Sequence, residues 1–124
     1  VSIKNLKQNN TAQEGDLLFL TKKIGIGVLT TASKKAILKD EDLQVAIDNM
    51  SRLNKIGEVL GSIPGVTSLT DVTGFGLAGH LIEMAEGSNL SAHIRMDAVP
   101  VIDSVLEYIR LGAVPGGTNR NWQT

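Results

Sequence analysis

Residues 70–80 read Thr70-Asp71-Val72-Thr73-Gly74-Phe75-Gly76-Leu77-Ala78-Gly79-His80. This stretch places one carboxylate, Asp71, beside a glycine-rich turn that joins a strand-like apolar run to a helix-like run. A magnesium-bound phosphate site uses such parts, because Mg²⁺ takes oxygen ligands and a helix start offers backbone N–H groups to an anion. The same residues contain G-x-G-x-x-G, the glycine pattern of dinucleotide-binding turns, so the sequence pattern alone is compatible with both kinds of site.

Working outward from this turn, short strand-like runs alternate with helical patterns. Three apolar or alternating runs predict strands: 16–21, 66–70 and 90–96. Apolar residues spaced three and four apart predict helices in three further segments: 41–60, 77–86 and 100–110. Residues 24–38 show a mixed pattern, because Gly25 and Gly27 weaken the helical reading there. The alternation predicts an α+β fold in which a small mixed sheet is covered by helices.

The segment 41–60 has the clearest helical spacing. Its apolar stripe is expected to face the core: Leu43, Ala46, Ile47, Met50, Leu53, Ile56 and Leu60. Pro100 is expected to begin the helix at 100–110, and the polar stretch 116–121 is expected to be a flexible loop. Residues 1–14 are polar and are predicted to be a linker or entry segment, which leaves one domain at 15–124.

The composition is that of an ordinary globular domain. The chain has 124 residues, of which 42% are hydrophobic and 20% charged, and its net charge is −1. Near-neutral charge gives no reason to expect nucleic acid or a membrane as a partner, and no apolar run approaches the roughly 20 residues of a membrane span. The absence of cysteine excludes disulfides and a cysteine-based zinc site. We expect a cytoplasmic protein.

Two further blocks extend the pattern around the turn. The upstream block reads Gly15-Asp16-Leu17-Leu18-Phe19-Leu20-Thr21-Lys22-Lys23, followed by Gly25-Ile26-Gly27-Val28-Leu29-Thr30-Thr31-Ala32. The downstream block reads Leu111-Gly112-Ala113-Val114-Pro115-Gly116-Gly117-Thr118-Asn119-Arg120-Asn121. Together with residues 70–80, which lie between them, these blocks resemble selenophosphate synthetase (selenide, water dikinase) in both their residues and their order along the chain. The resemblance runs from about Asn9 to the last residue.

The resemblance implies the α+β C-terminal domain shared with aminoimidazole ribonucleotide synthetase. It implies a parent enzyme that makes selenophosphate from selenide, ATP and water, releases AMP and phosphate, and forms a homodimer. The family's ATP-binding N-terminal domain and its cysteine or selenocysteine nucleophile would lie outside this chain. The domain at 15–124 is therefore expected to be incomplete at its C-terminal end, and the chain is expected to be inactive without its N-terminal domain.

The resemblance also assigns roles to individual residues. The aspartate of the family's D-V-T-G-F-G block ligates magnesium, which corresponds to Asp71 here; from the residues alone, Asp71 could instead cap a helix or shape a turn. Mg²⁺ would be shared with the N-terminal domain, because one carboxylate does not hold this ion tightly. The residue types themselves add candidate phosphate or nucleotide contacts, which are Thr73, Gly74, Gly76, Lys22 and Arg120; Lys22 could instead be part of a solvated turn. The family usually has Lys-Pro where this chain has Lys22-Lys23, and Arg120 could equally belong to an ordinary loop.

Two alternative functions remain open from the sequence. One is another ATP-using member of the aminoimidazole ribonucleotide synthetase superfamily. The other is a dinucleotide-binding module built on Gly74, Gly76 and Gly79, with Asp97 on the ribose. Asp71 argues against the second, because its charge would repel a pyrophosphate unless a cation intervened. His80 is expected to pack and hydrogen-bond locally, as most such histidines do.

Overall fold

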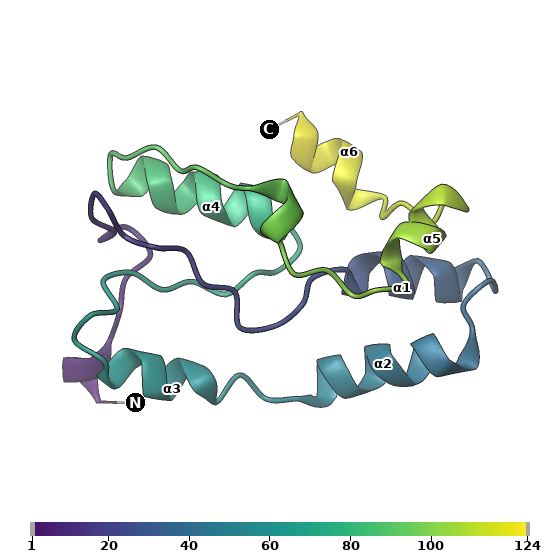
Figure 1. Cartoon of the computed structure of the whole chain (residues 1–124), viewed down its shortest axis with the longest axis horizontal. Coiled ribbons are helices and arrows are strands. Elements are labelled where there is room, and N and C mark those ends of the chain that lie inside the picture. The colour runs from purple at the N-terminus through teal and green to yellow at the C-terminus, as the bar shows by residue number, and fades with distance from the viewer. Residues whose placement is uncertain (1, 124) are drawn as a thin grey trace. The chain divides into compact units, whose positions relative to one another are not determined.

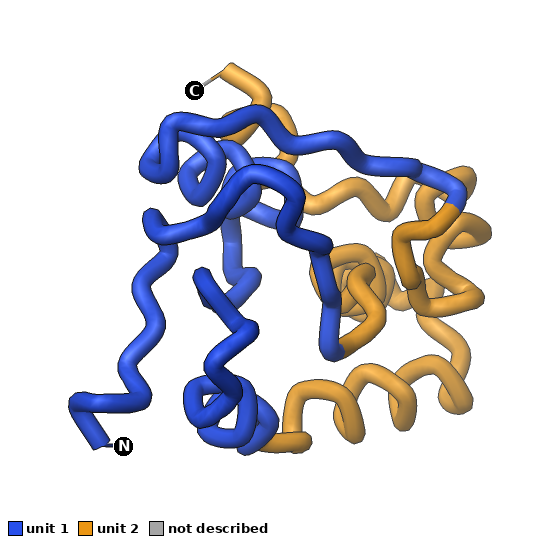
Figure 2. Tube along the Cα trace, turned by 60° about the vertical axis from the view of Figure 1, so that its left-hand side comes forward, with its two compact units in different colours: residues 1–21, 54–97 blue, residues 22–53, 98–124 orange. Residues whose placement is uncertain are grey.

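The computed structural model describes residues 2–123. The chain divides into two compact units, each built from two separate stretches of sequence (Figure 2). Unit 1 comprises residues 1–21 and 54–97, and unit 2 comprises residues 22–53 and 98–124. Of the helices in the described part of the chain, none has the length and apolar character needed to cross a membrane.

Unit 2 contains the buried apolar core. Its helices are α1 (Ile26–Lys34), α2 (Asp40–Ser51), α5 (Val105–Arg110) and α6 (Gly117–Trp122) (Figure 1). Helix α1 packs against both α2 and α5. The core cluster consists of Val28, Leu29, Ala32, Ala46, Ile102, Val105, Tyr108 and Ala113. Burial of these apolar side chains stabilises α1, α2 and α5, which are short helices that would be only marginally stable in isolation.

The start of α1 is fixed by a single parallel bridge. The backbone N–H of Ile24 donates to the carbonyl of Pro100 at 2.9 Å, and the N–H of Ile102 donates to the carbonyl of Ile24 at 3.0 Å. Gly25 follows with a φ of +126°, a backbone conformation that residues with side chains rarely adopt. The glycines that weakened the sequence pattern therefore do not prevent the helix; Gly25 forms the turn that leads into it.

Unit 1 has two helices of six residues or more among the described residues, joined by extended chain. These are α3 (Ile56–Ser62) and α4 (Gly76–Gly87), with the short 3-10 turns η1 (Ile3–Asn5) and η2 (Met96–Ala98) near its ends. Residues of the predicted entry segment pair with the segment after α3. The N–H of Leu69 donates to the carbonyl of Gln8 at 3.0 Å, and the Thr11 hydroxyl donates to the carbonyl of Thr67 at 2.7 Å.

The predicted small mixed sheet is wrong for the described residues. Residues 16–21, 66–70 and 90–96 are extended but are not strands, and the bridge between Ile24 and Val101 is isolated. A strand needs a neighbouring backbone that takes up its N–H and C=O groups in a ladder. Segment 66–70 instead meets its neighbour through side-chain hydroxyls and one backbone bond. In segment 16–21, Leu17 and Phe19 are 78% and 85% exposed, so the described chain covers neither side chain.

The single helix predicted at 41–60 is two helices, α2 and α3. Arg52 has the extended angles φ −71° and ψ 112°, which end α2. The ammonium group of Lys22 donates to the carbonyls of Asn49 and Arg52, so a side chain from another part of unit 2 satisfies the end of this helix. The predicted burial of the apolar stripe is also wrong for most of its members: Ala46 is buried, whereas Leu43, Ile47, Met50, Leu53 and Ile56 are exposed.

Two smaller differences concern the C-terminal part. The helix expected from Pro100 begins only at Val105, because Val101 is engaged in the bridge to Ile24. The loop expected at 116–121 is largely the helix α6. The N–H of Thr118 donates to the carbonyl of Pro115 at 3.0 Å, so a turn begun at Pro115 continues into the helix.

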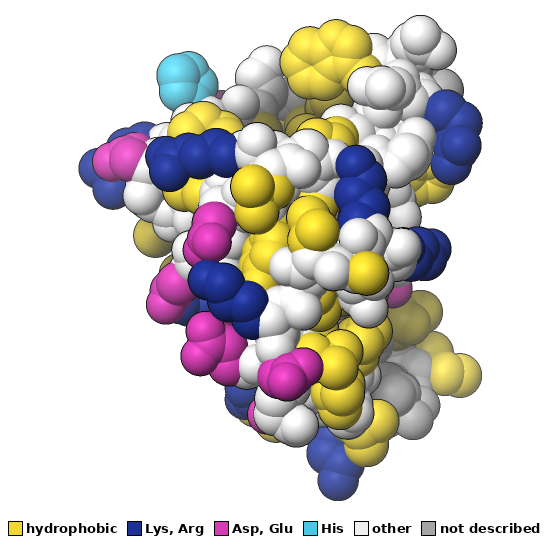
Figure 3. Space-filling model, turned by 90° about the vertical axis from the view of Figure 1, so that its right-hand side faces the viewer, with side chains coloured by type: hydrophobic (Ala, Val, Ile, Leu, Met, Phe, Trp, Pro, Cys, Tyr) yellow, Lys and Arg dark blue, Asp and Glu magenta, His cyan; other side chains and the backbone are white. Residues whose placement is uncertain are grey.

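The surface of the molecule mixes charged and apolar side chains. On the face drawn in Figure 3, hydrophobic side chains reach the surface between Lys, Arg, Asp and Glu side chains. Two exposed ion pairs belong to unit 2: Lys23 with Asp103 at 2.6 Å, and Lys39 with Glu107 at 3.2 Å. Exposed pairs of this kind contribute little to stability.

Candidate functional site

The glycine-rich turn leads directly into α4. Residues 71–75 are exposed, and the N–H of Gly76 donates to the carbonyl of Thr73 at 3.0 Å, which closes the turn. Gly76 has a φ of +74°, so a residue with a side chain would be strained at this position. Phe75 occupies the N-cap position and its side chain caps no backbone N–H group. The N–H of Gly76 is taken up by Thr73, but no N-cap side chain competes for the N–H groups that follow it in α4, so these would suit an external acceptor such as phosphate.

Asp71 is an exposed carboxylate on the extended chain just before this turn. Within residues 2–123, no three His, Cys, Asp or Glu side chains gather as a metal-binding group would. One exposed carboxylate nevertheless fits Mg²⁺, which keeps several waters and commonly takes one or two protein carboxylates together with phosphate oxygens. A magnesium ion at Asp71 would have to take its other ligands from water, from phosphate or from a further part of the protein.

A polar chain of contacts connects the turn to the body of α4. The Thr73 hydroxyl lies 2.9 Å from Nε2 of His80, whose side chain is almost fully buried. The other ring nitrogen, Nδ1, lies 3.5 Å from Oε2 of Glu83. Asn9 donates from Nδ2 to Oε1 of Glu83 at 3.0 Å, and the ring of Phe75 meets the imidazole edge-on at 5.9 Å between centroids.

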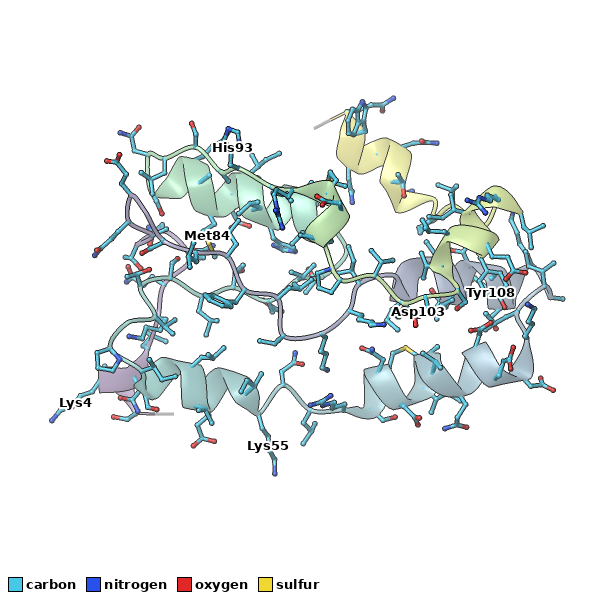
Figure 4. The ribbon with its side chains drawn as sticks, viewed as in Figure 1. Lys4, Lys55, Met84, His93, Asp103 and Tyr108 are labelled. Atoms are coloured by element: carbon cyan, nitrogen blue, oxygen red, sulfur yellow. The ribbon has the colours of Figure 1, made fainter. Side chains whose placement is uncertain are left out.

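Sequence reasoning predicted local hydrogen bonding for His80 but missed its partners. The spacing His80-x-x-Glu83 is a usable signal, because residues three apart on a helix are neighbours. No local signal points to Asn9, which reaches Glu83 across 74 positions of sequence. His93, the other histidine, is exposed and projects away from α4 (Figure 4).

The remaining predicted contacts belong to unit 2, whereas Asp71, Thr73, Gly74 and Gly76 belong to unit 1. Lys22 binds the carbonyls at the end of α2, as described above. Arg120 lies on α6 and is exposed.

The glycine pattern does not have the setting of a dinucleotide fold. That setting requires a strand running into the first glycine and a parallel sheet beside it. Residues 66–70 form no strand, and within the described chain the parallel pairing is limited to one bridge.

A second polar cluster is buried in unit 2 and is structural in character. The Tyr108 hydroxyl donates to Oδ2 of Asp42 at 2.6 Å and accepts the backbone N–H of Lys39 at 3.0 Å. The hydroxyl groups of Ser104 and Tyr108 favour the ionised carboxylate and lower the pKa of Asp42. The Ser104 contact falls outside ordinary hydrogen-bond geometry, so we assign the larger effect to Tyr108. Burial, followed by the bond to Asp42, raises the pKa of Tyr108.

Comparison with known proteins places the chain in a family. A family model described as AIR synthase related protein, C-terminal domain, matches residues 13–114. Proteins named selenide, water dikinase from Shewanella sp. (strain W3-18-1) and Shewanella baltica (strain OS155) are 55% and 54% identical to all 124 residues. Another, from Shewanella sp. (strain MR-4), is 52% identical over the same length.

The chain spans 35% of the length of each of these relatives. The matches confirm the resemblance drawn from residues 15–32, 70–80 and 111–121. The chain belongs to the family of the AIR synthase related protein C-terminal domain.

Proposed function

We propose that this chain is part of an ATP-dependent enzyme that makes selenophosphate from selenide, ATP and water with release of AMP and phosphate. Identity of 52–55% over the whole chain to proteins named selenide, water dikinase supports the proposal. Because the chain covers 35% of their length, the ATP-binding domain and the nucleophile would come from the remainder of the protein. That domain is the proposed partner, within a proposed homodimer.

The observation that carries the proposal is the exposed Asp71 carboxylate beside the open start of α4. Phosphoryl transfer concentrates negative charge around the reacting phosphorus, and preorganised cations and N–H groups stabilise it. Mg²⁺ would supply that positive charge. Asp71 would hold the ion, and the turn formed by Thr73, Gly74 and Gly76 would bring backbone groups close to phosphate oxygens. This part of the chain would form one wall of the site and exclude water from it.

The predicted phosphate contacts of Lys22 and Arg120 stay predictions. Lys22 would have to release the carbonyls at the end of α2 before its ammonium could reach a phosphate. Arg120 offers a planar donor group suited to bidentate phosphate binding.

The proposal is tested with a chimera in which this chain replaces the matching third of the Shewanella sp. (strain W3-18-1) relative. We expect AMP formation that requires both selenide and Mg²⁺. Asp71→Asn should lower its rate at least about a hundredfold, because metal-ion catalysis is worth several kcal/mol. Asp97→Asn is the matched control, since it removes an exposed carboxylate that only the dinucleotide hypothesis requires.

Equal rates for the Asp71→Asn and wild-type chimeras would contradict the proposal. The chain by itself is expected to form no AMP from ATP and selenide and to bind Mg²⁺ only weakly, because a single carboxylate supplies the site. Titration calorimetry that gave micromolar affinity for the isolated chain would argue for a complete metal site within it.

A further inference from the structure

The contacts of His80 determine which of its nitrogens carries the proton. Nδ1 is shielded from water and, among the described residues, has no hydrogen bond of ordinary geometry. Oε2 of Glu83 lies 3.5 Å away from it. An unprotonated Nδ1 would direct its lone pair at a carboxylate, whereas an N–H at this position would direct a positive hydrogen there. Glu83 therefore favours the tautomer with the proton on Nδ1.

Asn9 and Phe75 hold this arrangement in place. Asn9 donates to Oε1 of Glu83, which leaves Oε2 for the imidazole. Phe75 packs against the ring at an interplanar angle of 73°, which limits rotation of the imidazole. Side chains from two segments of unit 1, the one that contains Asn9 and the one that runs from Phe75 into α4, thus orient one ring toward Thr73.

The tautomer of His80 in turn determines the direction of the Thr73 hydroxyl. With the proton on Nδ1, Nε2 is an acceptor, and at 2.9 Å it takes the hydroxyl hydrogen of Thr73. A hydroxyl that has donated its one hydrogen cannot also donate to a phosphate. Its oxygen keeps lone pairs that a cation or a cation-bound water can use.

We propose that His80, held by Glu83 and Asn9, is a positioning residue that makes Thr73 an acceptor on the cation side of the turn, beside Asp71. This inference rests on the proposed function and refines it. Thr73 serves the magnesium ion or one of its waters, and the phosphate is left to the backbone groups of the turn and of α4.

The first test needs no substitution. Long-range ¹H–¹⁵N spectra of the ¹⁵N-labelled chain, recorded where imidazole is neutral, report the protonated nitrogen of each histidine. We expect His80 to carry its proton on Nδ1. His93 is an internal control, because an exposed imidazole in water favours the Nε2–H form. A proton on Nε2 of His80, alone or together with Nδ1, would overturn the inference.

Substitutions then test the cause. Glu83→Ala is expected to move the His80 population toward the Nε2–H tautomer, because the carboxylate that favours Nδ1–H is gone. Glu86→Ala on the same helix is the matched control and should leave the spectrum of His80 unchanged. An unchanged His80 tautomer in Glu83→Ala would show that Glu83 does not set it, which would overturn the proposed chain of contacts.

The activity of the chimera tests whether these contacts affect the use of Mg²⁺. Thr73→Val and Glu83→Ala are each expected to raise the Mg²⁺ concentration for half-maximal activity about tenfold, as loss of an outer-shell partner does. Thr73→Ser keeps a hydroxyl and should retain the wild-type Mg²⁺ response, and so should Glu86→Ala. A Thr73→Val chimera that matched wild type while Asp71→Asn was inactive would overturn this inference and leave the proposed function standing. An active Asp71→Asn chimera would overturn the proposed function, and with it the cation-side role of Thr73, whatever the tautomer of His80.

Discussion

The bond between Tyr108 and Asp42 gives the sharpest prediction for stability. Tyr108→Phe removes one oxygen atom and keeps the aromatic ring, so the packing of the core around it is preserved. Tyr108 is fully buried and Asp42 is 9% exposed, so water reaches neither group freely. The variant leaves a buried carboxylate without its donor at 2.6 Å and a backbone N–H without its acceptor.

The expected cost follows from the kind of bond that is lost. A hydrogen bond to a charged group contributes about 1.5–3 kcal/mol, and an unsatisfied buried partner pushes the loss toward the upper end. We therefore expect Tyr108→Phe to lower the free energy of unfolding by about 2–3 kcal/mol. Against a total of about 5–15 kcal/mol for a domain, this is a large fraction.

Urea unfolding followed by far-ultraviolet circular dichroism measures the effect. The urea concentration at which half of the protein is unfolded should fall. The slope of the free energy of unfolding against urea concentration should stay constant, because the substitution leaves the surface exposed on unfolding unchanged. A double-mutant cycle with Asp42→Asn isolates the pair, and Asp48→Asn, on the exposed side of α2, is the matched control. If Tyr108→Phe lowers the free energy of unfolding by less than about 0.5 kcal/mol, as is expected for the Asp48→Asn control, the reasoning is refuted.

The pH dependence gives an independent check with a defined sign. The pKa of Asp42 is lowered in the folded state, so its contribution is present above the unfolded value of about 3.9 and is lost as pH falls through the folded value. The difference in the free energy of unfolding between wild type and Tyr108→Phe should therefore become smaller at acidic pH. The pKa of Tyr108 is raised, so wild type should also lose stability as pH rises above about 10, a loss that the phenylalanine variant lacks.

Two other substitutions, each with a matched control, test the fold. Gly25→Ala should destabilise the chain by about 2–4 kcal/mol, because the φ is +126° and an added Cβ would clash with Cγ2 of Val105. Gly15→Ala, with a φ of +88° and open space around it, should cost only the backbone strain of about 1 kcal/mol in the same urea assay. Equal losses would show that the contact with Val105 does not matter. Lys22→Met should cost about 1 kcal/mol by removing the ammonium from the carbonyls at the end of α2, and Lys55→Met should be neutral by comparison.

The elements that local sequence defines were predicted well. Helix α4 was expected at 77–86 and runs from Gly76 to Gly87, because apolar spacing and the glycine-rich turn both act within it. The contact between Thr73 and His80 is also local, since one residue begins the turn and the other lies in the first helical turns of α4. Both residues therefore lie within the eleven consecutive residues that the sequence singled out, although the contact between them was not predicted.

The break between α2 and α3 depends on a distant residue. Apolar spacing continues through the break, so periodicity alone predicts one helix at 41–60. The end of α2 is satisfied by Lys22, which lies 30 positions before Arg52 in the sequence. A side chain so far away in the sequence does not change the apolar spacing of residues 41–60. In the same way, nothing in the sequence near Glu83 points to Asn9.

The predicted strands failed for a different reason. An apolar run such as 16–21 indicates side chains that favour burial, but a strand also needs a neighbouring backbone. The described chain offers Ile24 and Val101 for one bridge and no further ladder. The exposed stripe of α2 follows the same logic: its spacing correctly indicates a helix, whereas burial of the stripe would require a surface that the described residues do not place against it.

Under the proposed function, the charges around the turn would favour a cation and a phosphate that bind together. The open start of α4 favours an anion, whereas Asp71 repels one, so phosphate alone meets opposing effects. A cation alone meets Asp71 and the Thr73 oxygen but also the positive end of the helix. A magnesium–phosphate pair would suit all three groups, because Asp71 and the Thr73 oxygen would hold the ion and the N–H groups would hold the phosphate. Thr73→Val, which removes the acceptor oxygen, should therefore raise the Mg²⁺ concentration for half-maximal activity more than it raises the ATP concentration for half-maximal activity. Measuring both concentrations in the chimera tests this expectation.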